Sequence, residues 1–503
     1  MSERRQERLP EKRLVIISNR LPVSVVKEHG EWGVRPSSGG LVTALGPVLR
    51  NRGGLWIGWP GGVDHASSRE LLARHTRSIG YTLSSIGLSA EEMHDYYFGF
   101  SNEILWPLFH SLSNLCHYEP RYWSAYRDVN RRFADEIAAQ VTPDDFIWVH
   151  DYQLMCVARA LRQQGISTPI GFFLHIPFPS PDIFQRLPWR SQILEALLDF
   201  DLIGFQTEAH KRNFFQCVRA MFRDVSVSGR GPVSTLRVDQ REVRVGNFPI
   251  GIDYESFATQ AETQEVTETM IQLKGAVRSR CLVLGVDRLD YTKGIPYKLD
   301  AIRCALERYS ELHGNVTFIQ VVVPSRQEIP TYDDLKHQIE RQVGEINGEF
   351  ATPGWVPVQY AYRSLRRVEL LAYYRAAQIA LVTPLEDGMN LVAKEYCACS
   401  VDGNNVLVLS EFAGAAAQLR RGALLVNPYD REGMAEAIYR AYKMDLGERQ
   451  ERMRRMKKVV RESSIFEWVD SFLRAGSATE LEDFPPLREA LAGQEADVWW
   501  EGR

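Results

Sequence analysis

The segment LEDGMNLVAKE (385–395) combines acidic side chains, a glycine and the start of a predicted helix. Asp387 and Gly388 follow a predicted strand, and we expect the helix to begin at about Met389. The first N–H groups of a helix lack intrahelical acceptors and suit a diphosphate. Asp387 would then meet sugar hydroxyls, and Glu395, two helical turns on, the ribose hydroxyls of a nucleotide. The alternative is a capping Asp387 and a solvated Glu395.

A second segment, VDRLDYTKG (286–294), places two cations directly after another predicted strand. Arg288 and Lys293 could clamp a diphosphate leaving group and stabilise its developing charge, while Gly294 permits a tight turn. Arginine and lysine are common on surfaces, so this pattern alone is weak evidence for a site. It indicates one only because it follows a strand in the same predicted domain as the 387–395 segment.

Two polar residues end strands in the first half of the chain. Asp151 follows WVH and His175 follows FFL, so we expect both side chains at the carboxyl edge of a sheet. A lone histidine is more often structural, and the neighbouring His150 fits a core residue. Gly39 and Gly40 precede a predicted helix and would let backbone approach phosphate or sugar closely.

Arg20 and Arg326 each follow a strand, and two guanidiniums could form a bidentate phosphate site. Tyr97 and Trp106 lie nine residues apart, a spacing more typical of core residues than of ligand contacts.

The sequence Asp199-Phe200-Asp201 is a candidate metal-binding motif. This Asp-x-Asp pattern holds a divalent ion in many glycosyltransferases, but here it precedes a strand and should lie at the opposite sheet edge. We interpret it as a helix-to-strand junction. No His/Cys cluster has zinc spacing, and Cys397 and Cys399 do not share a helix face. The prediction is an enzyme with no metal and no cofactor.

Short apolar runs alternate with amphipathic segments in two successive series, which predicts an α/β protein with two Rossmann-like, doubly wound domains facing across a cleft. The predicted strands are 14–18, 146–150, 170–175 and 202–206, then 281–287, 316–324, 379–384, 406–411 and 424–428. The Pro- and Gly-containing segment 245–257 is the candidate junction. The predicted organisation is a tail at 1–13, domains at 14–248 and 249–475 with a last helix that crosses back, and a tail at 476–503.

Bulk composition limits the partners. The chain has 503 residues, a formal net charge of -4 and seven cysteines. This charge provides no polycationic field for nucleic acid, and no apolar run approaches the roughly 20 residues that span a bilayer. No secretory signal is recognisable at the N-terminus. We expect no nucleic-acid or membrane partner and a cytoplasmic location.

Many motifs in one order resemble the trehalose-6-phosphate synthase family, glycosyltransferase family 20. The segments include IISNRLPVSV, SSGGLVTAL, YYFGFSNEILWP, WVHDYQL, FFLHIPFPSP, DLIGFQT, NFPIGID, VDRLDYTKGI, PSRQEIPTY, EDGMNLVAKEY and LVLSEFAGAA. They run from about residue 14 to 470. The resemblance implies the two-domain GT-B fold and retaining, metal-free transfer of glucose from a nucleotide-glucose, typically UDP-glucose, to glucose 6-phosphate.

The resemblance also implies roles for individual residues. Catalytic roles fall to Asp151, His175, Arg288 and Lys293, with Asp151 orienting the acceptor sugar. The acceptor would meet Arg20, Trp59, Tyr97, Trp106, Asp151 and Arg326. The donor would meet Gly39, Gly40, His175, Arg288, Lys293, Arg367, Leu370, Asp387, Gly388, Met389, Asn390, Leu391, Val392 and Glu395.

Two alternatives stay open at this point. A related transferase with another phosphorylated acceptor would make glucosylglycerol phosphate, and an inactive regulatory homologue would bind ligand without turnover. The motif Asp-x-Asp-x-[TV] of a phosphatase domain is not found after residue 470, so we expect a separate phosphatase. The family also leads us to expect a homo-oligomer.

Overall fold

The computed structural model describes residues 12–28, 31–36, 40–61, 71–72, 74–76, 79–229, 231–277, 279–325 and 330–477. These residues form two compact units. Unit 1 runs to Pro249 and resumes at Trp468, while unit 2 covers Ile250–Glu467. The chain thus passes from one unit to the other within the segment 245–257, and again shortly after the start of its last helix.

Unit 1 is built on a nine-stranded sheet in the order β5-β4-β1-β6-β7-β8-β11-β10-β9. The first seven of these strands run parallel, and β10 and β9 add an antiparallel edge. The strands are β1 Arg13–Arg20, β4 Leu55–Trp59, β5 Thr82–Ser85, β6 Asp145–His150, β7 Ile170–Phe173, β8 Leu202–Phe205, β9 Val225–Ser228, β10 Val233–Val238 and β11 Arg241–Asn247. The sequence order reverses at β1, which lies between β4 and β6 and is therefore a topological switch point.

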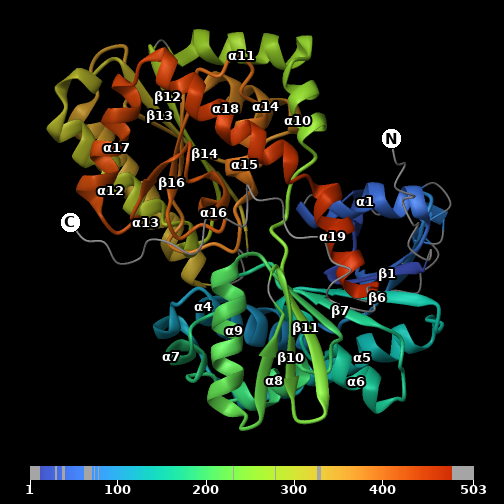
Figure 1. The fold of residues 1–503 in the computed structure, drawn as a ribbon. Helices are drawn as coiled ribbons and strands as arrows, with labels where there is room; N and C mark the ends of the chain where they lie inside the picture. The colour runs from blue at the N-terminus through green and yellow to red at the C-terminus, as the bar shows by residue number, and fades with distance from the viewer. Residues whose placement is uncertain are drawn as a thin grey trace, which may run out of the picture. The chain divides into compact units, whose positions relative to one another are not determined.

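Helices cover both faces of this sheet. They are α1 Gly40–Arg52, α3 Ala90–Glu92, a π-helix Met93–Leu105, α4 Trp106–Phe109, α5 Pro120–Ala138, α6 Val157–Gln163, α7 Pro181–Phe184, α8 Arg190–Leu197, α9 Glu208–Met221 and α19 Ile465–Ser477. Figure 1 shows α5, α6 and α8 on one side of β6 and β7, and α1 and α19 on the other. A hairpin of β2 Val23–Glu28 and β3 Glu31–Pro36 forms its own small sheet.

The last helix packs closely because β7 offers no side chain at one position. Phe472 of α19 stacks on Trp148 of β6, with ring centroids 4.3 Å apart and 6° between the planes. A Cβ added at Gly171 would lie 2.8 Å from the Phe472 ring. Glycine is therefore needed at Gly171 for the helix to reach the sheet.

Unit 2 contains a six-stranded, fully parallel sheet in the order β14-β13-β12-β15-β16-β17. Its strands are β12 Cys281–Arg288, β13 Val316–Val323, β14 Val358–Tyr362, β15 Ile379–Val382, β16 Val406–Ser410 and β17 Leu424–Val426. The order reverses at β12, which lies between β13 and β15. The switch point of this unit is therefore at the carboxyl ends of β12 and β15.

The helices of unit 2 also form two layers (Figure 1). They are α10 Tyr254–Ala261, α11 Gln264–Val277, α12 Ile295–Arg308, α13 Pro330–Phe350, α14 Arg367–Ala376, α15 Leu391–Ala398, α16 Ala416–Leu419, α17 Arg431–Lys443 and α18 Leu446–Glu462. One layer holds α12, α13 and α17, and the other holds α11, α14, α15 and α18.

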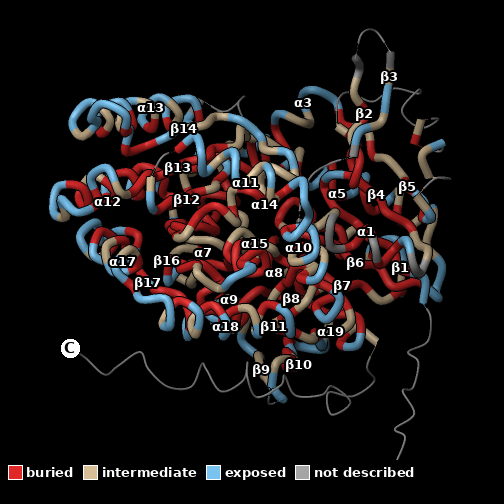
Figure 2. Tube along the Cα trace, turned by 90° about the horizontal axis from the view of Figure 1, so that it is seen from above, coloured by how far each residue is buried: buried red, intermediate tan, exposed pale blue. Residues whose placement is uncertain are grey.

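The strands are the most buried part of each unit (Figure 2). All nine predicted strands are present, several of them ending one or two residues earlier than expected. In β12 the charged Asp287 is also buried, where its Oδ2 accepts from Lys298 Nζ at 2.6 Å and from Gln320 Nε2 at 2.9 Å. Among the described helices, none is long and apolar enough to cross a bilayer.

Candidate functional site

The carboxyl edge of the unit 1 sheet brings Arg20 and Trp59 together. Arg20 ends β1, Trp59 ends β4, and the two are register partners. The Arg20 guanidinium carbon lies 4.3 Å from the centre of the Trp59 ring, which is a cation–π contact. A Cβ on Gly61, whose φ is +84°, would lie 2.9 Å from Arg20 Nη1. The backbone at Gly61 therefore leaves just enough room for this guanidinium.

Tyr97 joins this pair from the π-helix. Its ring lies 6.2 Å from that of Trp59 in an edge-on arrangement. Trp106, which follows the π-helix, is buried, and its ring lies 5.7 Å from Tyr152, the neighbour of Asp151. The rings of Trp59 and Tyr97 beside the Arg20 guanidinium suit a phosphorylated sugar, because ring faces pack on sugar C–H groups and the guanidinium binds phosphate.

Asp151 and His175 lie at the ends of β6 and β7, on the same sheet edge. Asp151 has φ +76°, its N–H donates to Phe173 O at 2.8 Å, and its Oδ1 accepts from the His175 N–H at 3.2 Å. A non-glycine residue at positive φ is uncommon and often marks a functional site. The backbone between the two strand ends thus holds the Asp151 carboxylate in one position.

The His175 ring contacts a residue of the neighbouring strand, His150 of β6. Its Nε2 lies 3.2 Å from Nδ1 of His150, and burial lowers the pKa of His175 to about 3. Burial, followed by the neighbouring His175, lowers the pKa of His150 well below its usual value. Both imidazoles are therefore neutral near pH 7.

In unit 2, Lys293 and Asp387 meet at the switch point. Lys293 follows β12, Asp387 follows β15, and Lys293 Nζ lies 2.5 Å from Asp387 Oδ2. Asn390 Nδ2 donates to the same oxygen at 3.2 Å. Both members of the ion pair are largely buried, so a ligand that reaches them meets a preorganised cation and acceptor rather than flexible surface charges.

Helix α15 begins at Leu391, two residues later than expected from the sequence. Its N-cap is Asn390, whose side chain accepts from Ala393 N–H at 3.3 Å, so capping by Asp387 is also wrong. Asn390 adopts φ +76°, which turns the chain sharply before the helix. The amides of Leu391 and Val392 then open the helix, where N–H groups have no intrahelical acceptor and suit a diphosphate.

The loop before α15 is held by a second loop that the sequence analysis did not assign a role. Gly414 N–H donates to Asp387 O at 3.0 Å, and Ala415 N–H donates to Met389 O at 2.7 Å. A Cβ at Gly414 would lie 1.9 Å from Gly388 O, so only glycine permits this contact. The signal that could have identified this support is the Gly in EFAGAA, which directly follows a strand.

Glu395 is half-buried rather than solvated. Tyr374 Oη donates to its Oε2 at 2.8 Å. Burial raises the pKa of Glu395, while the hydrogen bond from Tyr374 and the charge of Arg367 oppose that rise. Arg367 lies 3.5 Å from the centre of the Phe257 ring, and Leu370 follows one turn later in α14.

Arg288 ends β12 and is exposed, whereas its neighbour Asp287 faces the core. This alternation follows from the two-residue period of a strand. Gly40 is the first residue of α1. Gly39 and Arg326 lie outside the described residues, so their predicted roles stay predictions.

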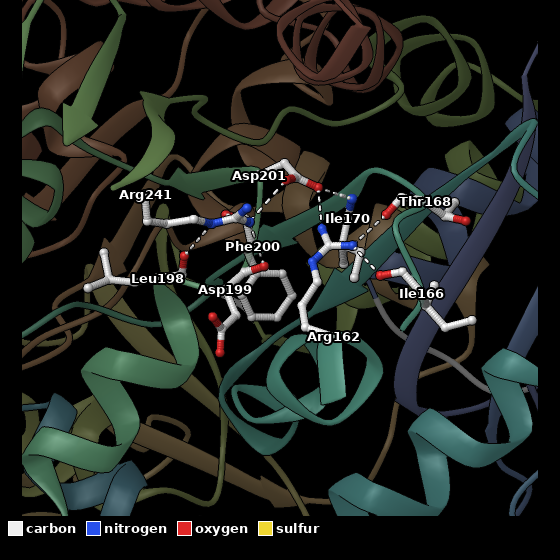
Figure 3. Close-up of polar contacts among 9 residues, drawn as sticks. All are labelled: Arg162, Ile166, Thr168, Ile170, Leu198, Asp199, Phe200, Asp201 and Arg241. Atoms are coloured by element: carbon white, nitrogen blue, oxygen red, sulfur yellow. Dashed lines mark hydrogen bonds and ion pairs between the residues drawn. The ribbon is translucent and has the colours of Figure 1, made fainter. Parts of the chain in front are cut away.

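The Asp-x-Asp sequence lies at the junction between α8 and β8, as predicted, at the opposite sheet edge from Asp151. Figure 3 shows the Asp201 carboxylate turned toward two arginines. Its Oδ2 accepts from Arg162 Nη2 at 2.6 Å, and its Oδ1 accepts from Arg241 Nη2 at 3.0 Å. Asp199 Oδ2 accepts from Arg159 Nε at 2.8 Å. These carboxylates tie together a helix, a loop and a strand.

Within the described part of the chain, no group of three or more His, Cys, Asp or Glu side chains is placed to hold a metal ion. The seven cysteines are all free thiols, and six of them are buried. Burial raises the pKa of Cys397 to about 12, so this thiol is protonated at neutral pH.

Two Rossmann-like domains, each with its polar residues after the strands at a switch point, define a glycosyltransferase of the GT-B class, as the sequence predicted. The chain belongs to glycosyltransferase family 20, whose model matches residues 12–477.

Individual relatives agree with this assignment. The chain is 42% identical over 472 residues to a bifunctional trehalose-6-phosphate synthase/phosphatase of Thermoproteus tenax, covering 92% of this chain and 63% of that protein. It is 42% identical to a trehalose-6-phosphate synthase of Mycobacterium sp. (strain KMS), covering 92% and 94% of the two chains. The solved structure of a UDP-forming alpha,alpha-trehalose-phosphate synthase from Burkholderia xenovorans in complex with glucose-6-phosphate has a TM-score of 0.84 and 37% identity, covering 93% and 100%.

Proposed function

We propose that the chain transfers glucose, with retention, from a nucleotide-glucose to glucose 6-phosphate and forms trehalose 6-phosphate. The observation that carries this proposal is the Lys293–Asp387 pair beside the start of α15. Lys293 provides a cation, Asp387 provides an acceptor for sugar hydroxyls, and the first turn of α15 provides backbone N–H groups without intrahelical acceptors. UDP-glucose is the proposed donor, because the Burkholderia xenovorans relative is described as UDP-forming.

The donor lies with its diphosphate between the start of α15 and the cations Arg288 and Lys293. Asp387 accepts hydrogen bonds from the glucose hydroxyls, and Glu395 accepts from the ribose. The further proposed donor contacts of unit 2 are Gly388, Met389, Asn390, Leu391, Val392, Arg367 and Leu370.

The acceptor lies against unit 1. Arg20 binds the phosphate of glucose 6-phosphate, and Trp59, Tyr97 and Trp106 pack against the sugar. The role of Arg326 at the phosphate stays a prediction. The Asp151 carboxylate orients the sugar ring by accepting from its hydroxyls. The contact between Arg20 and Trp59 supports this assignment, because it holds the guanidinium at the sheet edge before any ligand binds.

In the transfer step, the bond between the anomeric carbon of glucose and the diphosphate oxygen breaks. The oxygen of the acceptor hydroxyl bonds to that carbon from the face that the diphosphate leaves. The proton of that hydroxyl passes to a departing diphosphate oxygen, so no enzyme base is required. Arg288 and Lys293 stabilise the negative charge that develops on the leaving group. Positioning of the two substrates supplies much of the remaining rate enhancement, roughly 7–11 kcal/mol in well-oriented reactions.

The test is a matrix of nucleotide-glucose donors against phosphorylated acceptors, scored by nucleotide release and by identification of the product. We expect the highest kcat/KM for UDP-glucose with glucose 6-phosphate. Higher activity with glycerol 3-phosphate would replace this proposal with a glucosylglycerol-phosphate synthase. Folded protein that binds glucose 6-phosphate without turnover would instead indicate a regulatory homologue.

The product retains its phosphate, so release of free trehalose requires a phosphatase. The Thermoproteus tenax relative is a bifunctional synthase and phosphatase, and the present chain spans 63% of the length of that protein. We propose a separate phosphatase for the product of this chain. The cytoplasmic location and the homo-oligomeric state stay predictions.

A further inference from the structure

Two histidines of unit 1 share a hydrogen bond whose direction determines the tautomer of His175. Nδ1 of His150 lies 3.2 Å from Nε2 of His175, and the ring planes are 30° apart. Because both rings are neutral, each carries one N–H group. One of the two nitrogens must therefore donate and the other must accept.

The surroundings of His150 select the direction. His150 is fully buried, with the rings of Trp148 and Trp468 4.7 and 6.2 Å away. Among the described residues, neither His150 Nε2 nor the two indole N–H groups has a hydrogen-bond partner. A proton on His150 Nε2 would add a third buried donor without an acceptor, and orphaned buried N–H groups are rare. A proton on Nδ1 leaves only a lone pair at Nε2.

We propose that His150 is a positioning residue that donates from Nδ1 to Nε2 of His175 and thereby fixes the His175 proton on Nδ1. In this tautomer His175 presents a hydrogen-bond donor to a substrate oxygen. It cannot act as a base, because Nε2 is engaged and Nδ1 already carries a proton. The inference about substrate rests on the proposed function, whereas the tautomer does not.

The same contact supports Asp151. The His175 backbone N–H donates to Asp151 Oδ1, and His150 directly precedes Asp151 in the chain. The hydrogen bond between the rings therefore ties the end of β7 to the end of β6. Loss of the His150 donor should loosen both the His175 ring and the carboxylate that the His175 amide holds.

The direct test is ¹⁵N NMR of the full chain with labelled histidine at pH 7.5. The chain has 11 histidines, and spectra of His175→Asn and His150→Asn identify the two sets of signals. We expect a protonated Nδ1 and an unprotonated Nε2 for His175. A protonated Nε2 on His175 would overturn the proposal. Trp468→Phe serves as the packing control, since it changes a buried neighbour of the pair and should leave the tautomer of His175 unchanged.

Kinetics of two His150 variants test the positioning role. An asparagine amide nitrogen occupies nearly the place of Nδ1, so His150→Asn keeps the donor, whereas His150→Phe keeps the ring shape without it. We expect kcat near wild type for His150→Asn and about tenfold lower for His150→Phe, the effect of one hydrogen bond, with KM changed little. Equal kcat in the two folded variants would refute the role.

The two proposals fail in distinguishable ways. If the wild-type chain shows no transferase activity with any donor and acceptor, the proposed function is wrong, but the NMR spectrum still determines the tautomer. If His150→Phe does not fold, as judged by its thermal transition, the wild-type spectrum alone decides.

Discussion

Lys293 and Asp387 form an ion pair across the switch point of unit 2, with Nζ 2.5 Å from Oδ2, although 94 residues separate them in the sequence. The parallel sheet produces this contact, because β12 and β15 are neighbours and their carboxyl ends open at the same edge. Lys298, five residues after Lys293 and in the following helix α12, pairs instead with the buried Asp287. Two lysines in the same segment thus have different partners, and we expect different consequences when each is removed.

Replacing Lys293 with alanine should lower kcat by about 100-fold or more, because the diphosphate loses a cation as its charge develops. Arg288→Ala should act in the same direction. Steady-state kinetics with both substrates saturating, together with a thermal melt, would measure this. Turnover near wild type in a folded Lys293→Ala protein would contradict the role.

Replacing Lys298 with alanine should mainly lower stability. The change leaves the buried Asp287 carboxylate with only Gln320 as a side-chain partner, and breaking a buried pair typically costs about 3–5 kcal/mol. Urea unfolding would measure the difference. Lys443→Ala is the matched control, because its pair with Glu311 is exposed and screened by solvent, so its loss should change stability little. Similar losses in the two variants would contradict this interpretation.

Gly414→Ala should impair donor binding. The new Cβ would lie 1.9 Å from Gly388 O, so the loop that carries Asp387 must move. We expect KM for the nucleotide-glucose to rise by about tenfold or more, with a smaller change for the acceptor. Gly275→Ala is the control, because a Cβ there meets nothing within 4 Å and α11 should gain about 0.5–1 kcal/mol. An unchanged donor KM would show that the two loops do not depend on each other.

Histidines whose pKa is lowered in the folded state should make the protein sensitive to acid. Burial lowers the pKa of His175 and of His210 to about 3, while both groups titrate near 6.5 in the unfolded chain. The unfolded state therefore binds more protons between about pH 6.5 and 3, and stability falls as pH falls through this window, by at most about 1.4 kcal/mol per pH unit for each histidine. Urea unfolding at pH 7.5, 6 and 5 should give a shallower pH dependence for His210→Asn than for wild type. Parallel profiles would indicate that His210 titrates normally.

The sequence predicted nine of the parallel strands and the position of Asp387 directly after one of them, because buried parallel strands are nearly continuous apolar runs and polar residues after them stand out. It missed the parallel strands β4, β5, β11 and β14. The start of α15 was placed two residues too early, since the positive φ of Asn390 is a tertiary effect that composition does not report. Tyr97 could not be assigned from helical spacing, because it lies in a π-helix whose turns are wider than those of an α-helix. The contact between His150 and His175 depends on ring orientation, which no spacing encodes.

Arg20→Lys tests the acceptor site most sharply. The guanidinium lies over the Trp59 ring and beside Gly61, a geometry suited to planar, two-pronged recognition of phosphate. A lysine keeps the charge but loses the second donor and the stacking. We therefore expect KM for glucose 6-phosphate to rise by roughly tenfold or more, while KM for the nucleotide-glucose stays within about twofold. Gly61→Ala should move the acceptor KM in the same direction, because its Cβ would push against Arg20 Nη1. A rise confined to the KM for the nucleotide-glucose would contradict the assignment of Arg20 to the acceptor site.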